Sequence, residues 1–178
     1  MPDALDAFTR SQIHRKLAVY LMAQQEQDDA RYHADLAMTN AIISGDSTSQ
    51  GKARWVASHV YLELGEESRA IPLLEDMLAA GLKQEQSGGV HEAAYTTVLS
   101  TMGQLARCYL STGLTEAARA MERRSVAHAL RYADRRQSEI GNSYRGLAVS
   151  YAHGEPIWDS VEHYIELAAA EYGRTHPG

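Results

Sequence analysis

The sequence predicts an all-α protein of about eight helices, arranged as four antiparallel helical hairpins. The 178-residue chain contains 27 Ala and only four Pro. Ala has the highest helix propensity, whereas Pro breaks helix interiors. One spacing of small and large residues recurs four times along the chain, and a turn signal lies within each copy. Hydrophobic residues make up 44 % of the chain, which is enough for a packed core.

The repeated spacing joins a small residue, a large residue three positions later, and a second small residue twelve positions after the first. Residues three apart share one face of a helix, whereas the intervening turn places the second small residue on the next helix. We therefore expect the small residues to lie where antiparallel helices approach closely. The copies begin 40, 48 and 42 residues apart, and they are Ala18/Leu21/Ala30, Ser58/Tyr61/Ala70, Ala106/Tyr109/Ala118 and Ala148/Tyr151/Ser160.

The turn signals divide the chain into eight predicted helices, which pair in order. Their expected ranges are 9–24 with 28–44, 51–64 with 66–80, 90–112 with 115–132, and 135–153 with 157–173. The hairpins are expected to form a single domain over 1–178, with repeat units over 9–44, 51–80, 90–132 and 135–173.

Residues that favour caps and turns predict the helix ends. The first hairpin is expected to turn at the polar run Gln25–Asp28. Gly65 and Gly113 close the next two hairpins, because glycine is common just after the last helical residue. Thr115 is expected to cap the sixth helix, and Pro156 precedes the last helix, where its missing N–H costs little.

The longest loop is expected between the second and third hairpins. Gly81 is read as the stop of the fourth helix, and Ser87-Gly88-Gly89 as a flexible tip. The segment 81–89 falls in the 48-residue interval, so an inserted loop and a longer following helix would explain that spacing.

Charge and composition exclude several function classes. The net charge of −6 makes the whole chain repel nucleic acid and anionic lipid. No apolar run approaches the roughly 20 residues that span a bilayer. The single cysteine, Cys108, cannot form an internal disulfide, which agrees with a cytoplasmic location. Arg outnumbers Lys by 14 to 3, a bias typical of GC-rich bacterial genomes.

The third and fourth copies resemble the tetratricopeptide repeat (TPR) family. They combine Leu and a small residue with an aromatic residue three later, a Gly near the turn and a small residue on the second helix. These residues are Leu105, Ala106, Tyr109, Gly113 and Ala118, then Leu147, Ala148, Tyr151, Gly154 and Ser160. The resemblance covers about 12–172. Because the spacing exceeds the common 34 residues, it looks more like the longer-helix repeats of kinesin light chains and bacterial peptide-sensing regulators.

The resemblance implies a right-handed superhelix in which the first helix of each hairpin lines a concave groove. Its charged groove residues are all positive, although the chain is acidic overall, so we expect a wall of one sign that attracts anionic ligands. The groove candidates are Gln12, Arg15, Val19, Met22, Lys52, Trp55, His59, Leu62, Ser100, Gly103, Arg107, Leu110, Asn142, Arg145 and Val149.

These residues predict a non-enzymatic adaptor or scaffold that binds an acidic segment or a C-terminal carboxylate of another protein or peptide. Arg15, Arg107 and Arg145 would form bidentate hydrogen bonds to carboxylates, and Lys52 would add positive charge. Asn142 would hold a backbone amide, and Trp55 with His59 would receive an apolar or aromatic side chain. The same residues also fit solvated positions, or partners for acidic side chains of adjacent helices.

Catalysis, cofactors and metals find little support in the sequence. It contains no GxSxG elbow, no Walker phosphate loop and no dinucleotide-binding glycine pattern. The pairs Asp29/His33 and His59/Glu63 have the i,i+4 spacing of metal ligands, but neither pair has an obvious third ligand. We therefore expect no enzyme activity, no cofactor and no metal.

Two further surfaces stand out. An arginine run is interpreted as a solvated outer face rather than a phosphate site, and it comprises Arg119, Arg123, Arg124, Arg131, Arg135 and Arg136. The last helix is apolar around more than half its circumference, which indicates either a partner surface, for a second copy of the chain or a piece of a larger protein, or a final helix packed on both sides by a bent superhelix. The residues of this expected homodimer interface are Trp158, Val161, Ile165 and Tyr172.

The alternative function is a ligand- or peptide-sensing regulatory domain. It resembles the repeat half of bacterial transcription regulators, which join such repeats to a DNA-binding helix-turn-helix. The repeats here begin close to Met1. On this interpretation the chain is a separated domain, or an antagonist, of such a regulator.

Overall fold

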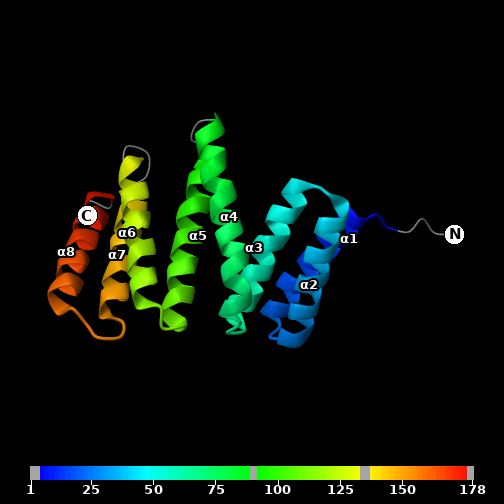
Figure 1. Cartoon of the computed structure of the whole chain (residues 1–178), viewed down its shortest axis with the longest axis horizontal. Helices are drawn as coiled ribbons and strands as arrows, with labels where there is room; N and C mark the ends of the chain where they lie inside the picture. Colours follow the sequence, from blue (N-terminus) through cyan, green and yellow to red (C-terminus); the bar gives the residue numbers. More distant parts are fainter. Residues whose placement is uncertain (1–4, 89–91, 133–136, 176–178) are drawn as a thin grey trace. The chain divides into compact units, whose positions relative to one another are not determined.

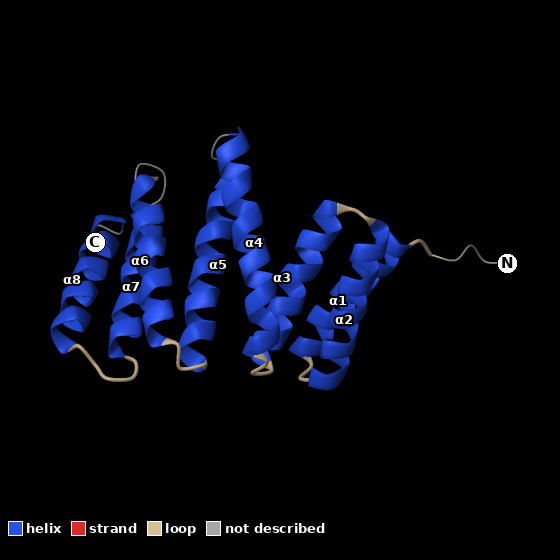
Figure 2. Ribbon diagram, in the orientation of Figure 1, coloured by secondary structure: helices blue, strands red, loops and turns tan. Residues whose placement is uncertain are grey.

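A computed structural model describes residues 5–88, 92–132 and 137–175, and over these ranges the chain is helical with no strand (Figures 1 and 2). The predicted all-α class with eight helices is confirmed for this part of the chain. Among the helices described, none has both the length and the apolar composition needed to cross a bilayer. The helices are α1 Ala7–Ala23, α2 Gln27–Ser44, α3 Ser47–Glu63, α4 Glu67–Gly88, α5 Glu92–Ser111, α6 Thr115–Arg131, α7 Gln137–Ala152 and α8 Trp158–Thr175.

The chain divides into two compact units, Met1–Met77 and Leu78–Gly178. The first unit holds α1, α2, α3 and the start of α4, and the second holds the rest of α4 with α5 to α8. The division falls inside α4, so the expected repeat unit 51–80 contributes residues to both. A single domain with one continuous superhelix stays a prediction.

Within each unit, helices contact both their sequence neighbours and the next helix but one. In the first unit α1 packs on α2 and α2 on α3, and α1 also contacts α3. In the second unit α5, α6, α7 and α8 pack in succession, and α5 also contacts α7. The first helices of successive hairpins therefore meet inside each unit, as expected for stacked hairpins.

The small residues of the repeat lie at these contacts. All of them are buried except Ser160, which is half-buried. A methyl or hydroxymethyl side chain lets two helix axes approach closely, because interaxial distance depends on the side chains at the contact. The burial confirms the packing that the spacing predicts for Ala18, Ala30, Ser58, Ala70, Ala106, Ala118 and Ala148.

The hairpin turns repeat one backbone geometry. Gln25, Gly65 and Gly113 each have a positive φ, of 63°, 71° and 78°, and each follows the large residue of its copy by four positions. The next residue then donates its backbone N–H to the carbonyl of that large residue, at 2.9, 2.8 and 2.7 Å respectively. Glycine adopts this left-handed conformation without a Cβ penalty, whereas Gln25 holds it at some cost.

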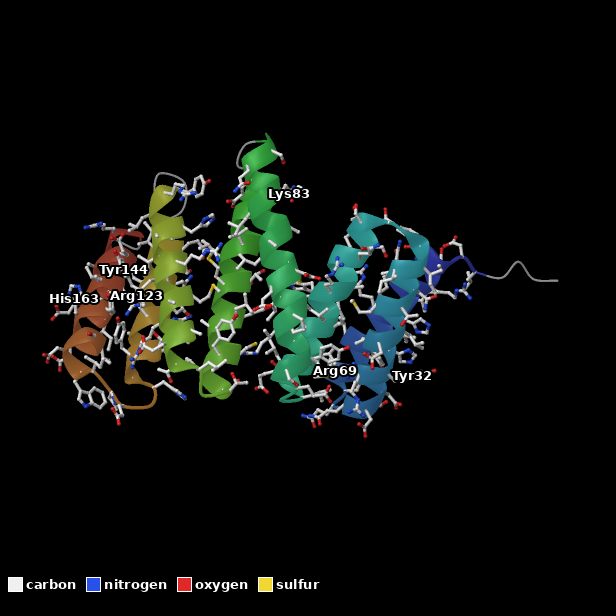
Figure 3. The ribbon with its side chains drawn as sticks, viewed as in Figure 1. Tyr32, Arg69, Lys83, Arg123, Tyr144 and His163 are labelled. Carbon is white, nitrogen blue, oxygen red and sulfur yellow. The ribbon has the colours of Figure 1, made fainter. Side chains whose placement is uncertain are left out.

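The expected loop over 81–89 is wrong for its described part, because α4 continues to Gly88. Lys83, labelled in Figure 3, lies within the helix. Gly81 serves close packing rather than helix termination, since a Cβ there would stand 2.7 Å from Cγ2 of Val98 on α5. Further along, Glu85 Oε1 lies 3.1 Å from Nε2 of the buried His128 on α6. Gly89 lies outside the described residues.

The expected cap at Thr115 is also wrong. Thr115 is the first residue of α6, and the cap position belongs to Leu114, which makes no side-chain cap hydrogen bond. Side chains cap other helices instead: Asp6 and Asp46 accept hydrogen bonds from the N–H groups three residues later, at 2.7 and 2.6 Å. The Asp46 cap lets α3 begin four residues before the predicted start at 51.

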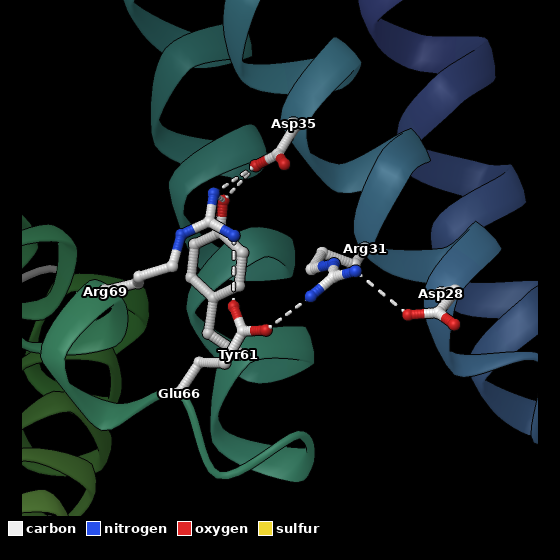
Figure 4. Close-up of polar contacts among 6 residues, drawn as sticks. All are labelled: Asp28, Arg31, Asp35, Tyr61, Glu66 and Arg69. Atoms are coloured by element: carbon white, nitrogen blue, oxygen red, sulfur yellow. Dashed lines mark hydrogen bonds and ion pairs between the residues drawn. The ribbon is translucent and has the colours of Figure 1, made fainter.

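In the first unit the aromatic residue of the repeat anchors a polar network that joins α2, α3 and the start of α4 (Figure 4). Tyr61 donates its hydroxyl proton to Asp35, and the Arg69 guanidinium lies 4.1 Å from the Tyr61 ring centroid. Arg69 also contacts Asp35 at 2.7 Å, and Glu66 accepts hydrogen bonds from Arg69 at 3.0 Å and from Arg31 at 2.9 Å. Burial and the neighbouring Asp35 raise the pKa of the Tyr61 hydroxyl.

In the second unit Tyr151 likewise lies beneath arginines, which corrects the interpretation of the arginine run. The guanidinium carbons of Arg119 and Arg123 lie 4.8 and 5.7 Å from its ring centroid, and Arg123 donates to its hydroxyl at 2.5 Å. Arg119 is buried and donates to the Ser150 carbonyl. These two side chains therefore hold α6 against α7, whereas Arg124 and Arg131 are exposed and Arg135 and Arg136 lie outside the described residues.

Candidate functional site

A cavity of about 680 Å³ opens between α5, α6 and α7 of the second unit. It brings together Arg107 from α5 with Asn142 and Arg145 from α7, three residues that the sequence places in one groove. The other lining residues are Leu99, Ser100, Gly103, Gln104, Leu110, Glu122, Ser125, Glu139, Ser143, Gly146 and Val149.

Helical spacing explains how α5 and α7 present these side chains. Asn142, Arg145 and Val149 stand three and four residues apart, so they form one stripe on α7. Arg107 belongs to an equivalent stripe on α5, and Gly103 lies one turn before it with open space where a Cβ would stand. Gly103 thus leaves the cavity open on the α5 side.

Glu122 of α6 lies at the cavity and was missed by the sequence analysis. The residue is 8 % exposed, and its carboxylate has no hydrogen-bond or ion-pair partner among the described residues. It lies against the backbone of Gly146, where an added Cβ would stand 2.4 Å from its Oε2. Burial raises the pKa of this carboxyl group to about 7.

The expected wall of one charge sign is wrong in both units. Glu122 and Glu139 line the same cavity as Arg107 and Arg145. Glu122 comes from the second helix of its hairpin, whereas the resemblance assigns the groove to the first helices. In the first unit, Asp46 likewise lines a cavity with two basic residues.

Asn142 is held in place by the last helix. Its Oδ1 accepts a hydrogen bond from the Tyr172 hydroxyl at 2.7 Å. The Tyr172 ring packs over Gly141, where an added Cβ would stand 3.0 Å from a ring carbon. Since its amide oxygen already has this donor, Asn142 is oriented to offer its NH₂ group to an acceptor.

The four candidates of the first unit line two smaller cavities. Arg15 and Lys52 border one of about 150 Å³, next to Gln12. Trp55 and His59 border another of about 320 Å³, where their rings stack with centroids 5.8 Å apart at an interplanar angle of 7°. The indole of Trp55 is about half exposed and can receive an apolar group. Val19 and Met22 border the same cavity as Trp55, whereas Leu62 is buried and borders none of the three.

The expected interface residues of α8 separate into two groups. Trp158 and Ile165 are exposed by 63 % and 54 %. Val161 is buried in a core cluster with Leu147, and Tyr172 contacts α7 as described above. Val161 is therefore unavailable to a partner. The homodimer through this helix stays a prediction, and of the four residues only Trp158 and Ile165 are exposed enough to contact a second copy.

Among the described residues, no group of three His, Cys, Asp or Glu side chains lies close enough to hold a metal ion. His33 contacts His14 of α1 instead, with their Nδ1 atoms 2.9 Å apart and their rings stacked. Burial and the neighbouring His33 lower the pKa of the His14 imidazole.

Comparison with known proteins gives no family: no protein-family model and no curated protein matches the chain. The TPR resemblance therefore rests on the residues quoted above. Arg107, Asn142 and Arg145 share one cavity, and its geometry is the basis for the function proposed below.

Proposed function

We propose that the chain is a cytoplasmic, non-enzymatic TPR-like scaffold that binds a peptide or a protein segment by its carboxylate groups. The observation that supports this most is that Arg107, Asn142 and Arg145 line one cavity from two facing helices. A C-terminal carboxylate or an acidic side chain offers acceptors that match these donor types.

Arg145 is the donor best suited to a carboxylate. Its side chain is exposed at the cavity and makes no hydrogen bond or ion pair with any described residue. A guanidinium presents paired N–H donors in a plane, which match the two oxygens of a carboxylate. Hydrogen bonds to charged groups contribute about 1.5–3 kcal/mol, so this contact alone is worth roughly ten- to a hundredfold in affinity.

The size of the cavity favours a short segment. Its volume of about 680 Å³ lies within the range of roughly 300–1,000 Å³ that is usual for ligand sites. The oriented Asn142 adds a donor for a main-chain carbonyl, because its own oxygen is engaged by Tyr172. A chain terminus of a few residues fits both the volume and the donors.

A positional-scanning tetrapeptide library, synthesised both as free acids and as C-terminal amides, tests this proposal with the full chain. We expect free-acid pools to bind at least tenfold more tightly than amide pools. Arg145→Glu should abolish that difference. Arg124→Glu is the matched control, because Arg124 is exposed on α6 and lies outside the cavity.

Two outcomes would reject the proposal. One is equal binding of the free-acid and amide pools, or no binding of either. The other is a free-acid preference that persists in a folded Arg145→Glu variant. Far-UV circular dichroism of both variants establishes that the helices remain formed.

The second candidate function is a sensing domain for a small molecule or signal peptide, which the cavity volume also supports. A ligand that binds only the folded state raises the melting temperature, and the rise grows with the logarithm of its concentration. Low-molecular-weight extract fractions that shift melting, while the tetrapeptide pools do not, would favour this function over the scaffold.

A further inference from the structure

The carboxylate of Glu122 is the group that the fold of the second unit leaves unsatisfied. The residue is 92 % buried, and no described side chain or backbone group donates a hydrogen bond to it. A buried carboxyl group without a donor carries a substantial desolvation cost. Such a group is uncommon in a folded protein and calls for an explanation.

No cation among the described residues offsets this cost. Burial alone raises the pKa of Glu122, and neither Arg107 nor Arg145 contributes to the shift. Both arginines border the same cavity as the carboxylate, so the site has a basic region at Arg107 and Arg145 and an acidic region at Glu122.

The glycine on the facing helix keeps the carboxylate accessible from the cavity. Gly146 lies directly opposite, and any side chain there would occupy the space now taken by the carboxylate. Ser125 and Ser143, which border the cavity beside it, are bonded to each other at 3.0 Å. Neither serine donates to Glu122, so no donor for its carboxylate is found among the described residues.

We propose that Glu122 determines ligand specificity by receiving a cationic side chain, Lys or Arg, of the bound peptide. The inference rests on the proposed function, because the arginines hold the carboxylate of the same peptide. An ammonium or guanidinium group supplies both the hydrogen bonds and the opposite charge that the buried carboxylate lacks. The ligand is thus a bipolar peptide, with a basic side chain toward α6 and a free carboxylate toward Arg107 and Arg145.

The test compares tetrapeptide free-acid pools that differ at one position, with Lys or Arg against the uncharged residues Gln and norleucine. The full chain should prefer a basic residue at one position by about ten- to a hundredfold. Glu122→Gln should lose that preference and still prefer free acids over amides. Glu122→Met, an apolar replacement of similar size, provides a second variant should the Gln variant fail to fold. Glu162→Gln is the matched control, because it removes an exposed carboxylate of α8 outside the cavity.

The outcomes separate this inference from the function on which it rests. A wild-type chain that binds free acids without favouring basic residues overturns the role of Glu122 and leaves the scaffold intact. An undiminished preference in folded Glu122→Gln or Glu122→Met overturns it as well. Failure of every free-acid pool to bind overturns the scaffold itself.

Discussion

The carboxylate of Glu122 lies against the backbone of Gly146, close enough that a Cβ at position 146 would stand 2.4 Å from Oε2 and 2.6 Å from Cδ. Helices α6 and α7 therefore meet through a buried acid and a glycine. The same contact keeps the carboxylate at the cavity that Arg107 and Arg145 border. Stability and ligand recognition thus depend on one pair of residues.

Gly146→Ala should be less stable than Gly103→Ala by about 1 kcal/mol. The added methyl group displaces the carboxyl end of the Glu122 side chain, and this cost offsets most of the roughly 1 kcal/mol that the higher helix propensity of Ala contributes. Gly103→Ala is the control, because it adds a methyl group in α5 where nothing lies within 4 Å. That change should stabilise the protein by about 0.5–1 kcal/mol. Urea unfolding measures both, and equal effects of the two substitutions would refute the close contact.

The contribution of Glu122 to the free energy of unfolding should fall as pH rises. Its folded-state pKa of about 7 lies above the unfolded value of 4.5, so the folded state binds the proton more tightly. The associated stability is complete below pH 4.5 and is lost as pH rises through about 7. A shift of this size corresponds to about 3 kcal/mol.

Glu122→Gln should therefore be markedly more stable than the wild type at pH 8 and close to it at pH 4.5. Urea midpoints at half-unit intervals from pH 4.5 to 8 measure the difference, with Glu162→Gln as the control that keeps the wild-type profile. A constant difference across this range would show that the carboxyl group titrates normally.

The sequence predicts the helices well because the local signals agree with the packing. At the first three hairpin turns a left-handed residue follows the large residue of the repeat by four positions, so the spacing and the turn report the same geometry. Gly81 misleads because glycine serves two purposes. It was read as a helix stop, yet it allows α4 to approach Val98 of α5, and only the tertiary contact distinguishes the two.

The site is predictable in part for a similar reason. Helical spacing places Arg107, Asn142 and Arg145 on the inner faces of α5 and α7, and they line one cavity. Glu122 was missed because it belongs to α6, and an acidic residue in a polar helix gives no sign of burial. The interior glycine at position 146 is a signal of close contact in this case, but the helical Gly103 has nothing within 4 Å, so glycine alone does not locate the buried acid.

Gln25→Gly should stabilise the first unit by about 1 kcal/mol. Gln25 holds a φ of 63°, which costs a residue with a Cβ about 1–2 kcal/mol relative to glycine. Gly65→Ala is the matched reverse change at the next turn, with a φ of 71° and nothing within 4 Å to collide with a methyl group. It should destabilise by a similar amount. The melting temperatures of both variants measure these effects. A Gly65→Ala melting temperature equal to that of the wild type would argue against the shared turn geometry.

Tyr61→Phe should destabilise the protein by about 1 kcal/mol. It removes the hydroxyl that donates to Asp35 and contacts Arg69, while the ring stays beneath the guanidinium (Figure 4). Tyr32→Phe is the control, because Tyr32 is 59 % exposed on α2. Urea midpoints of the two variants should differ, and a Tyr61→Phe midpoint equal to that of Tyr32→Phe would assign no stability to the network.

The most direct test of the central claim is a thermodynamic cycle on one selected tetrapeptide, measured by titration calorimetry. The dissociation constants of its free-acid and amide forms are compared for the wild type and for Arg145→Glu. If the cavity holds the carboxylate, the amide binds wild type at least tenfold more weakly, and the two forms bind the variant equally. The same free-acid to amide ratio in both proteins would contradict the claim.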